Sequence, residues 1–147
     1  MIYKPLRMNT GILSRKIMRL LKSFIVWTCF IPVAILNGGL REYVLVRLVG
    51  GKAALPISGV LLSIFIFLTI WFVLPRLSKD FDMKDCLTIG ICWALLTIAF
   101  ESVSEIAGGS NITEILAAYN PLTGNLWVLV LLTTLFSPIL LKILRRI

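Results

Sequence analysis

Long apolar stretches separated by short polar connections make up most of the chain. Residues 53–74 contain no charged side chain, and a helix of this length, at 1.5 Å per residue, measures about 33 Å, enough to cross the hydrocarbon core of a bilayer. Largely apolar stretches also occupy residues 24–40, 86–103 and 126–144. The pattern therefore predicts four transmembrane helices over these ranges, packed as a bundle in an all-α membrane protein.

The segment before the first apolar stretch, residues 1–23, holds six basic side chains and no acidic one. Apolar residues recur in it at helical spacing, so from about Ser14 we predict a basic amphipathic helix on an anionic membrane leaflet. A basic segment followed by an apolar stretch is also typical of a signal peptide, but no small-x-small cleavage pattern follows here. We expect residues 1–147 to form one membrane domain with membrane lipids as partners.

The connection between the third and fourth stretches, residues 101–125, is rich in Gly, Ser, Asn and acidic residues. A short apolar patch at residues 112–116 predicts a short interfacial helix before the last span, capped by Asn111 or Thr113 and ended before Pro121. Connections of this length tend to be functional or disordered, so this loop is one place to look for a site.

Composition supports membrane insertion. Apolar residues make up 59% of the chain and charged residues 15%, whereas soluble domains average roughly 45–50% and about 25%. Lys and Arg number 15 against 7 Asp and Glu, an excess that in a soluble protein would suggest nucleic acid. In a membrane protein the basic excess first indicates topology, and we expect no nucleic-acid partner.

The distribution of basic residues predicts the orientation. If both termini are cytoplasmic, the N-terminal segment, the loop at residues 75–85 and the C-terminus place 12 of the 15 basic residues on that side. The positive-inside rule therefore predicts a protein integral to the cytoplasmic (inner) membrane with both termini in the cytoplasm. Trp27 and Trp71 would then be interfacial anchors at the cytoplasmic ends of their helices, and Trp127 at the outer end of the last.

Polar residues near the outer ends of the first and third stretches form the candidate site. Asn37 and Arg41 are four residues apart and share a helix face. Because the first and third helices run parallel, Arg41 and Glu101 reach a similar depth, and we predict that they form an ion pair, with Glu42 as the rival partner of Arg41. Such a cluster either locks two helices together or binds a ligand or ion. Its candidate members are Asn37, Arg41, Glu42, Glu101, Tyr119 and Asn120.

Small residues recur inside the apolar stretches. Gly38 and Gly39 allow a helix break or a close backbone approach. Pairs of small residues four positions apart favour tight helix packing in lipid, with the lining of a pathway as the alternative. These pairs are Ala34 with Gly38, Gly59 with Ser63, and Gly90 with Ala94.

Residues that carry common enzyme chemistry are scarce. The chain has no His, and its three Cys form no Cys-x-x-Cys pair, which argues against a zinc or redox centre. The sequence contains no nucleophile–base pair and no phosphate-binding loop. We therefore expect no catalytic residue, no metal and no cofactor.

Short motifs lie near the predicted helix ends: Asn37-Gly38-Gly39-Leu40-Arg41-Glu42, Gly51-Lys52-Ala53-Ala54, Ser58-Gly59, Phe100-Glu101, Leu116-Ala117-Ala118-Tyr119-Asn120 and Gly124-Asn125-Leu126-Trp127. Together they resemble a family of small bacterial four-helix membrane proteins without an assigned activity. That family's pattern is similar to N-G-x-x-R-E, then Phe-Glu, then D-Y-N and G-R-L-W. The chain departs from it at Ala118 and Asn125, where an acid and a base are expected, so the resemblance implies the architecture more than a catalytic loop.

Three functions are compatible with these residues. The first is a non-catalytic accessory protein, or one that binds a lipid or small molecule through the outer polar cluster. The alternative is a small-solute or ion transporter, which would have to be a homo-oligomer because four short helices enclose little space alone. The third is an enzyme acting on a lipid or quinone, for which the polar residues fix no reaction.

Overall fold

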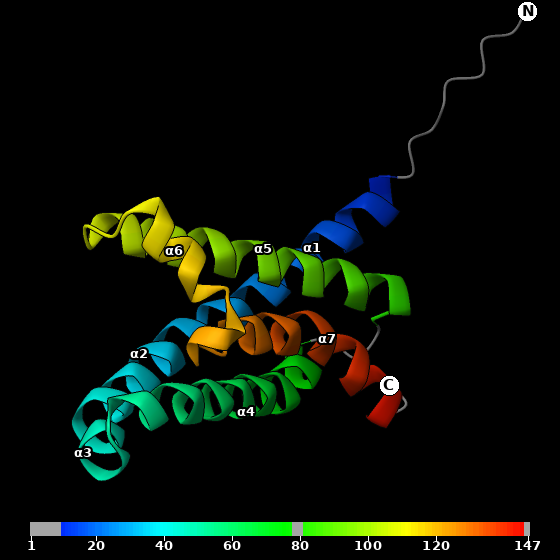
Figure 1. Cartoon of the computed structure of the whole chain (residues 1–147). Helices are drawn as coiled ribbons and strands as arrows, with labels where there is room; N and C mark the ends of the chain where they lie inside the picture. The colour runs from blue at the N-terminus through cyan, green and yellow to red at the C-terminus, as the bar shows by residue number, and fades with distance from the viewer. Residues whose placement is uncertain (1–9, 78–80, 146–147) are drawn as a thin grey trace, which may run out of the picture.

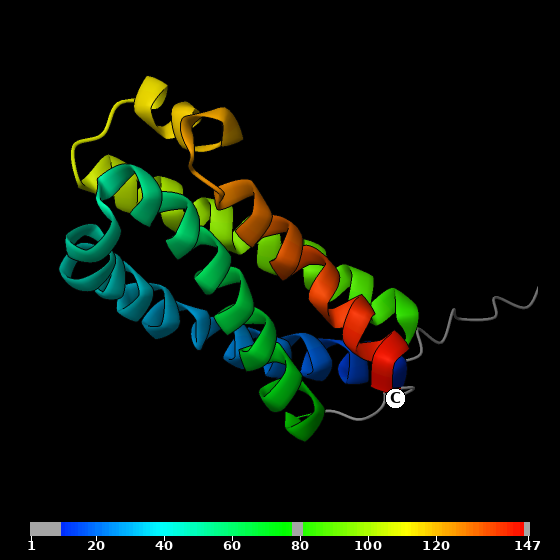
Figure 2. The same ribbon diagram turned by 60° about the horizontal axis from the view of Figure 1, so that its bottom comes forward.

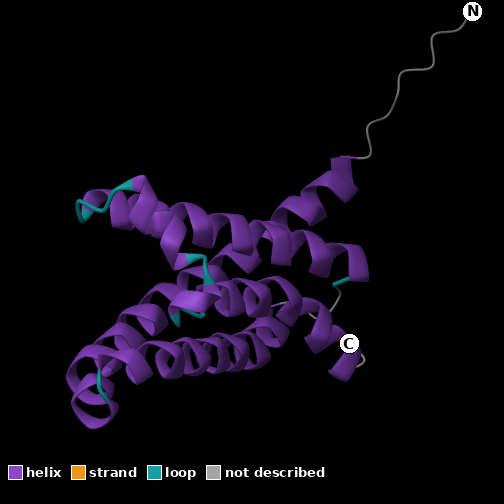
Figure 3. Ribbon diagram, viewed as in Figure 1, coloured by secondary structure: helices purple, strands orange, loops and turns teal. Residues whose placement is uncertain are grey.

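The computed structural model describes residues 10–77 and 81–145. Within those ranges every regular element is a helix and no strand occurs (Figure 3), so the predicted all-α architecture is confirmed. The elements, labelled in part in Figure 1, are α1 (Thr10–Thr28), α2 (Phe30–Leu40), the π-helical turn η1 (Arg41–Leu45), α3 (Val46–Val49), α4 (Gly51–Leu77), α5 (Met83–Ala107), α6 (Ile112–Ala118), the 3-10 turn η2 (Pro121–Thr123) and α7 (Trp127–Arg145).

Four helical units are long and apolar enough to cross a membrane, as predicted. They are Thr10–Val49, Gly51–Leu77, Met83–Ala107 and Trp127–Arg145. Large apolar side chains stay exposed on their outer faces, as a lipid-facing surface requires; Leu36, for example, is 74% exposed.

The first of these units is longer than the predicted range of residues 24–40. It begins at Thr10 and ends at Val49, so the described part of the basic segment is helical as expected but continues directly into the apolar helix. Residues 1–9 lie outside the described residues. Because Ser23, the last residue of this segment, is buried and α1 contacts α4 and α5, the end of the segment already belongs to the bundle.

The predicted break or close approach at Gly38 and Gly39 is wrong. Both residues are helical, and a Cβ added at either would meet nothing within 4 Å. The long helix is irregular at two other places, a turn at Cys29 and the π-helical turn at residues 41–45. The first has a local cause, since Pro32 has no N–H to bond the carbonyl of the residue four positions earlier.

The two ends of the bundle differ in the elements they contain (Figure 1 and Figure 2). At one end α1 begins, α4 ends, α5 begins and α7 ends; the connections from α3 to α4 and from α5 to α7 lie at the other. We call the first the basic end and the second the cavity end. The first and third predicted spans therefore run parallel, as expected.

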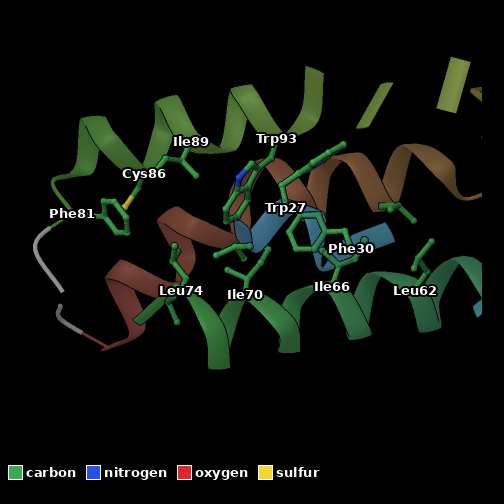
Figure 4. Packing of buried hydrophobic residues seen from close by; sticks show 13 residues of the cluster. Trp27, Phe30, Leu62, Ile66, Ile70, Leu74, Phe81, Cys86, Ile89 and Trp93 are labelled. Carbon is green, nitrogen blue, oxygen red and sulfur yellow. The ribbon is translucent and has the colours of Figure 1, made fainter. Parts of the chain in front are cut away.

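Apolar side chains fill the bundle between these ends (Figure 4). Trp93 of α5 is 1% exposed; its Nε1 donates to the carbonyl oxygen of Ser23 at 3.0 Å, and its ring meets Phe30 edge to face at 5.3 Å between centroids. Trp27 is buried beside it and donates from Nε1 to Oγ1 of Thr97 at 3.0 Å. The predicted anchoring role of Trp27 is therefore wrong, because a helix that begins at Thr10 places this residue well inside the bundle.

Two of the three small-residue pairs are explained by packing. A Cβ on Gly90 would collide with the backbone carbonyl of Leu135 in α7, and a Cβ on Gly59 would lie 2.8 Å from Cβ of Leu126. These glycines therefore let α5 and α4 approach α7 closely, as predicted. Gly38 has no such neighbour and instead lines a cavity described below.

The predicted short helix before the last span is confirmed as α6. Asn111 is its cap: the side-chain oxygen accepts from the backbone N–H of Glu114 at 3.0 Å, and the Glu114 carboxylate accepts from the backbone N–H of Asn111 at 3.0 Å. This reciprocal capping box satisfies two amide donors that a helix start otherwise leaves free. Thr113, the other candidate cap, is inside the helix.

Candidate functional site

A cavity of about 690 Å³ opens between α2, α4, α5 and α7 at the cavity end. Its volume is in the range of sites that hold small molecules, about 300–1,000 Å³. We call it the polar cavity because its lining includes Asn37, Arg41, Glu42, Ser58, Glu101, Glu105 and Asn125. Four of the six residues predicted for the site therefore lie around one space.

Asn37 is a buried polar residue of this lining. It is 5% exposed, and its Nδ2 donates to Oγ of Ser58 at 2.8 Å and to the Ser58 carbonyl oxygen at 3.2 Å, which joins α2 to α4. Its Oδ1 is buried and has no hydrogen-bond partner among the described residues. A buried acceptor left unpaired costs about 1–3 kcal/mol, so this oxygen is suited to a donor that the chain does not supply.

The predicted ion pair between Arg41 and Glu101 does not form. Nε of Arg41 donates instead to Oε1 of Glu42 at 3.1 Å, the partner considered as the rival. The reason is position: Arg41 and Glu42 are neighbours in η1, whereas Glu101 lines the cavity from a different helix, α5. Arg41 and Glu101 line the same space without touching.

Two carboxylates from α5 face the polar cavity one helical turn apart. Glu105 accepts a hydrogen bond from Oγ of Ser110 at 2.6 Å, while Glu101 has no hydrogen bond or ion pair with any described residue. Since Arg41 is neutralised by Glu42, these two carboxylates leave the lining with an excess of negative charge. Glu105 was absent from the predicted site, although its spacing of four from Glu101 marks a shared helix face.

The connection before α7 contributes less than predicted. Asn120 accepts from the backbone N–H of Leu122 at 3.0 Å and so caps η2, and neither Asn120 nor Tyr119 lines the polar cavity. Trp127, which does line it, has a buried Nε1 without a partner among the described residues. Trp127 supplies an unpaired donor, and Asn37 supplies an unpaired acceptor. The sequence predicts Trp127 only as a membrane anchor and gives no sign that it lines a cavity.

Packed apolar residues close the polar cavity toward the basic end. A second, largely apolar cavity of about 40 Å³ lies next to it. The two cavities share Ala34, Leu62, Glu101, Trp127 and Val130 in their linings. Beyond these residues stand the buried rings of Trp27 and Phe30. Within the described residues the polar lining is therefore confined to one end of the bundle.

No protein-family model matches the chain, and comparisons with curated proteins and with solved structures find no match either. The resemblance to small bacterial four-helix membrane proteins therefore stays a prediction. The fold and the site define an all-helical bundle with four helices able to span a membrane and a polar cavity at one end.

Proposed function

We propose that this protein is a non-catalytic membrane protein that binds a small molecule or lipid head group carrying a cationic amine in the polar cavity. The observation that carries the proposal is the polar cavity of about 690 Å³, whose lining includes Asn37, a residue with a buried Oδ1 that has no partner among the described residues. A binding site is the simplest reason to keep such a group buried.

The charges of the lining support an amine rather than an anion. Arg41 is paired with Glu42, so the groups left to attract a ligand are the carboxylates of Glu101 and Glu105. A carboxylate next to lipid and apolar side chains is costly unless a cation or a hydrogen-bond donor satisfies it. An ammonium group offers three N–H donors and a positive charge, which suits Glu101 and the free oxygen of Asn37.

The basic residues support an orientation for this site. The basic end, where α1 begins and α7 ends, holds eight described basic residues, and the cavity end holds Arg41, Arg47 and Lys52. By the positive-inside rule the basic end faces the cytoplasm of an inner membrane. The ligand would then reach the polar cavity from the outer side.

The packing below the cavity favours binding over conduction. An oligomeric transporter needs a route from the polar cavity to the basic end, and in the single chain Trp27, Phe30 and Ile66 stand in its way. Mass measurement of the purified protein in detergent separates the two functions. A strict monomer fits the binding proposal, whereas an oligomer that moves amines across vesicles contradicts it.

Thermal unfolding in detergent tests the ligand class, with ethanolamine as the probe and acetate as the anionic control. Ethanolamine should raise the melting temperature and acetate should not, since saturating ligand at about 100 times its Kd adds about 2.7 kcal/mol of stability. Glu101→Gln should remove the ethanolamine shift. Glu114→Gln, on α6 and outside the cavity lining, is the matched control. Equal shifts with both probes, or a full shift in Glu101→Gln, would reject the proposal.

A further inference from the structure

A third cavity, smaller than the polar cavity, lies at the basic end between α1 and α5. It measures about 180 Å³ and is lined by Lys16, Arg19, Leu20, Lys84, Asp85 and Ile89, among others; we call it the basic groove. This is well above the roughly 10–15 Å³ that a cavity needs to hold one water molecule, so the groove can admit a phosphate group. The polar cavity and its proposed amine ligand play no part in this site.

One ion pair joins the two walls of the basic groove. Nη1 of Arg19 lies 2.5 Å from Oδ2 of Asp85, and both side chains are half-buried. The same carboxylate oxygen accepts from the backbone N–H of Asp82 at 3.1 Å. Asp85 is therefore fully engaged, and it neutralises Arg19.

Two lysines beside this pair have no acidic partner among the described residues. Lys16 on α1 and Lys84 on α5 line the groove from opposite walls, and neither side-chain ammonium has a hydrogen bond or ion pair with another described residue. Asp82, the other described acid nearby, accepts from the backbone N–H of Met83 at 2.9 Å and serves as the cap of α5. Within the described residues the groove thus has two ammonium groups without an acidic partner and attracts an anion.

The remaining lining distinguishes among anions. Leu20 and Ile89 supply an apolar floor, and exposed apolar residues continue from the groove along α1 and α5, including Leu13, Ile17 and Leu87. A soluble anion gains nothing from these surfaces, whereas the acyl chains of a lipid do.

We infer that the basic groove binds the phosphate group of an anionic phospholipid from the leaflet at the basic end. The phosphate lies between Lys16 and Lys84, and the acyl chains lie along the apolar faces of α1 and α5. This differs from the general attraction of a basic segment to an anionic surface, because it assigns the binding to one residue from each of two helices rather than to every base on α1.

Titration of the purified full chain in detergent with phosphatidylglycerol, read by native mass spectrometry, tests this site. Lys16→Gln with Lys84→Gln should weaken phosphatidylglycerol binding about tenfold, as expected when two bases near an anionic phosphate are removed. Arg15→Gln with Lys22→Gln removes the same charge from α1 outside the groove lining and should change the binding little. A large excess of inorganic phosphate should not displace the lipid.

Conservative variants and folding measurements keep the outcome clear. Lys16→Arg with Lys84→Arg should retain binding, and circular dichroism should show the helical content of every variant unchanged, since neither lysine has a partner to lose. Equal weakening by the two Gln pairs would overturn the groove in favour of uniform surface attraction. Displacement by inorganic phosphate would overturn the lipid in favour of a soluble anion.

Discussion

The two ends of the bundle each hold an arginine–carboxylate pair, but the pairs do different things. At the basic end Arg19 reaches Asp85, 66 residues away in sequence, and ties α1 to α5. At the cavity end Arg41 pairs with its neighbour Glu42 and ties no helices together. The pair at the basic end therefore links two helices, whereas the pair at the cavity end lies within one helical segment.

The charge that remains after pairing is also opposite at the two ends. The basic groove keeps the ammonium groups of Lys16 and Lys84, and the polar cavity keeps the carboxylates of Glu101 and Glu105. One arginine is neutralised at each end, and the neighbouring charged side chains that have no ion pair among the described residues leave the two ends with opposite charge.

Gly90→Ala should have the largest effect, because it acts where the helices are closest. The added Cβ would collide with the backbone carbonyl of Leu135. The backbone of α5 fixes the position of the Cβ and the backbone of α7 fixes that of the carbonyl, so α5 and α7 must separate. We expect the free energy of unfolding to fall by about 2 kcal/mol or more, measured by denaturant unfolding in detergent. Gly39→Ala is the matched control, with nothing within 4 Å, and should raise it by up to about 1 kcal/mol. A similar loss of unfolding free energy in both variants would contradict the assignment of Gly90 to a close helix contact.

Breaking the ion pair between Arg19 and Asp85 at the basic end should have the second-largest effect. Arg19→Gln leaves Asp85 with 18% of its side chain exposed and without its cation. The loss should be about 1–2 kcal/mol, between the values for exposed and fully buried pairs. A double-mutant cycle with Asp85→Asn should give a favourable coupling energy, and zero coupling would show that the pair does not join the helices.

Asn37→Leu should separate binding from stability at the cavity end. It removes two hydrogen bonds to Ser58 but also the unpaired buried oxygen, so stability should change by less than about 1 kcal/mol. Ethanolamine binding, followed by the melting shift, should weaken about tenfold because one good hydrogen bond is lost. If Asn37→Leu kept the full ethanolamine shift, Asn37 would not be part of the binding site.

Breaking the pair at the cavity end should have the smallest effect. The side chains of Arg41 and Glu42 are 37% and 62% exposed, and such pairs contribute about 0–1 kcal/mol. Arg41→Gln should therefore change the free energy of unfolding little, in contrast to Arg19→Gln. A double-mutant cycle between Arg41 and Glu101 should give a coupling energy close to zero. If Arg41→Gln instead lowered the free energy of unfolding by several kcal/mol, the ion pair predicted from the sequence would be supported.

The positions of the helices could be predicted from the sequence because lipid demands long apolar stretches, and α6 could be predicted because its capping chemistry is local. Which face of each long helix is buried could not be predicted. A soluble helix shows its buried face by its apolar stripe, but here Leu36 is exposed and the adjacent Asn37 is buried, so polarity gives no such sign. The same ambiguity hid the burial of Trp27 and the cavity position of Trp127.

The partner of Arg41 could not be predicted for a different reason. Equal depth in two parallel helices fixes one coordinate only, and it does not fix how far apart the two helices lie across the bundle. Four members of the candidate site were nevertheless found, because polar residues in apolar helices tend to face the protein interior.

The π-helical turn at residues 41–45 shifts the register of the first helix by one residue. The cavity-lining positions run from Ala34 through Asn37 and Arg41 to Val46. In a regular α-helix of 3.6 residues per turn, a residue five positions after Arg41 would point about 140° away from it. The wider turn brings Val46 back to the same side, so a chain shorter by one residue here would present a different side chain to the polar cavity while leaving every span in place.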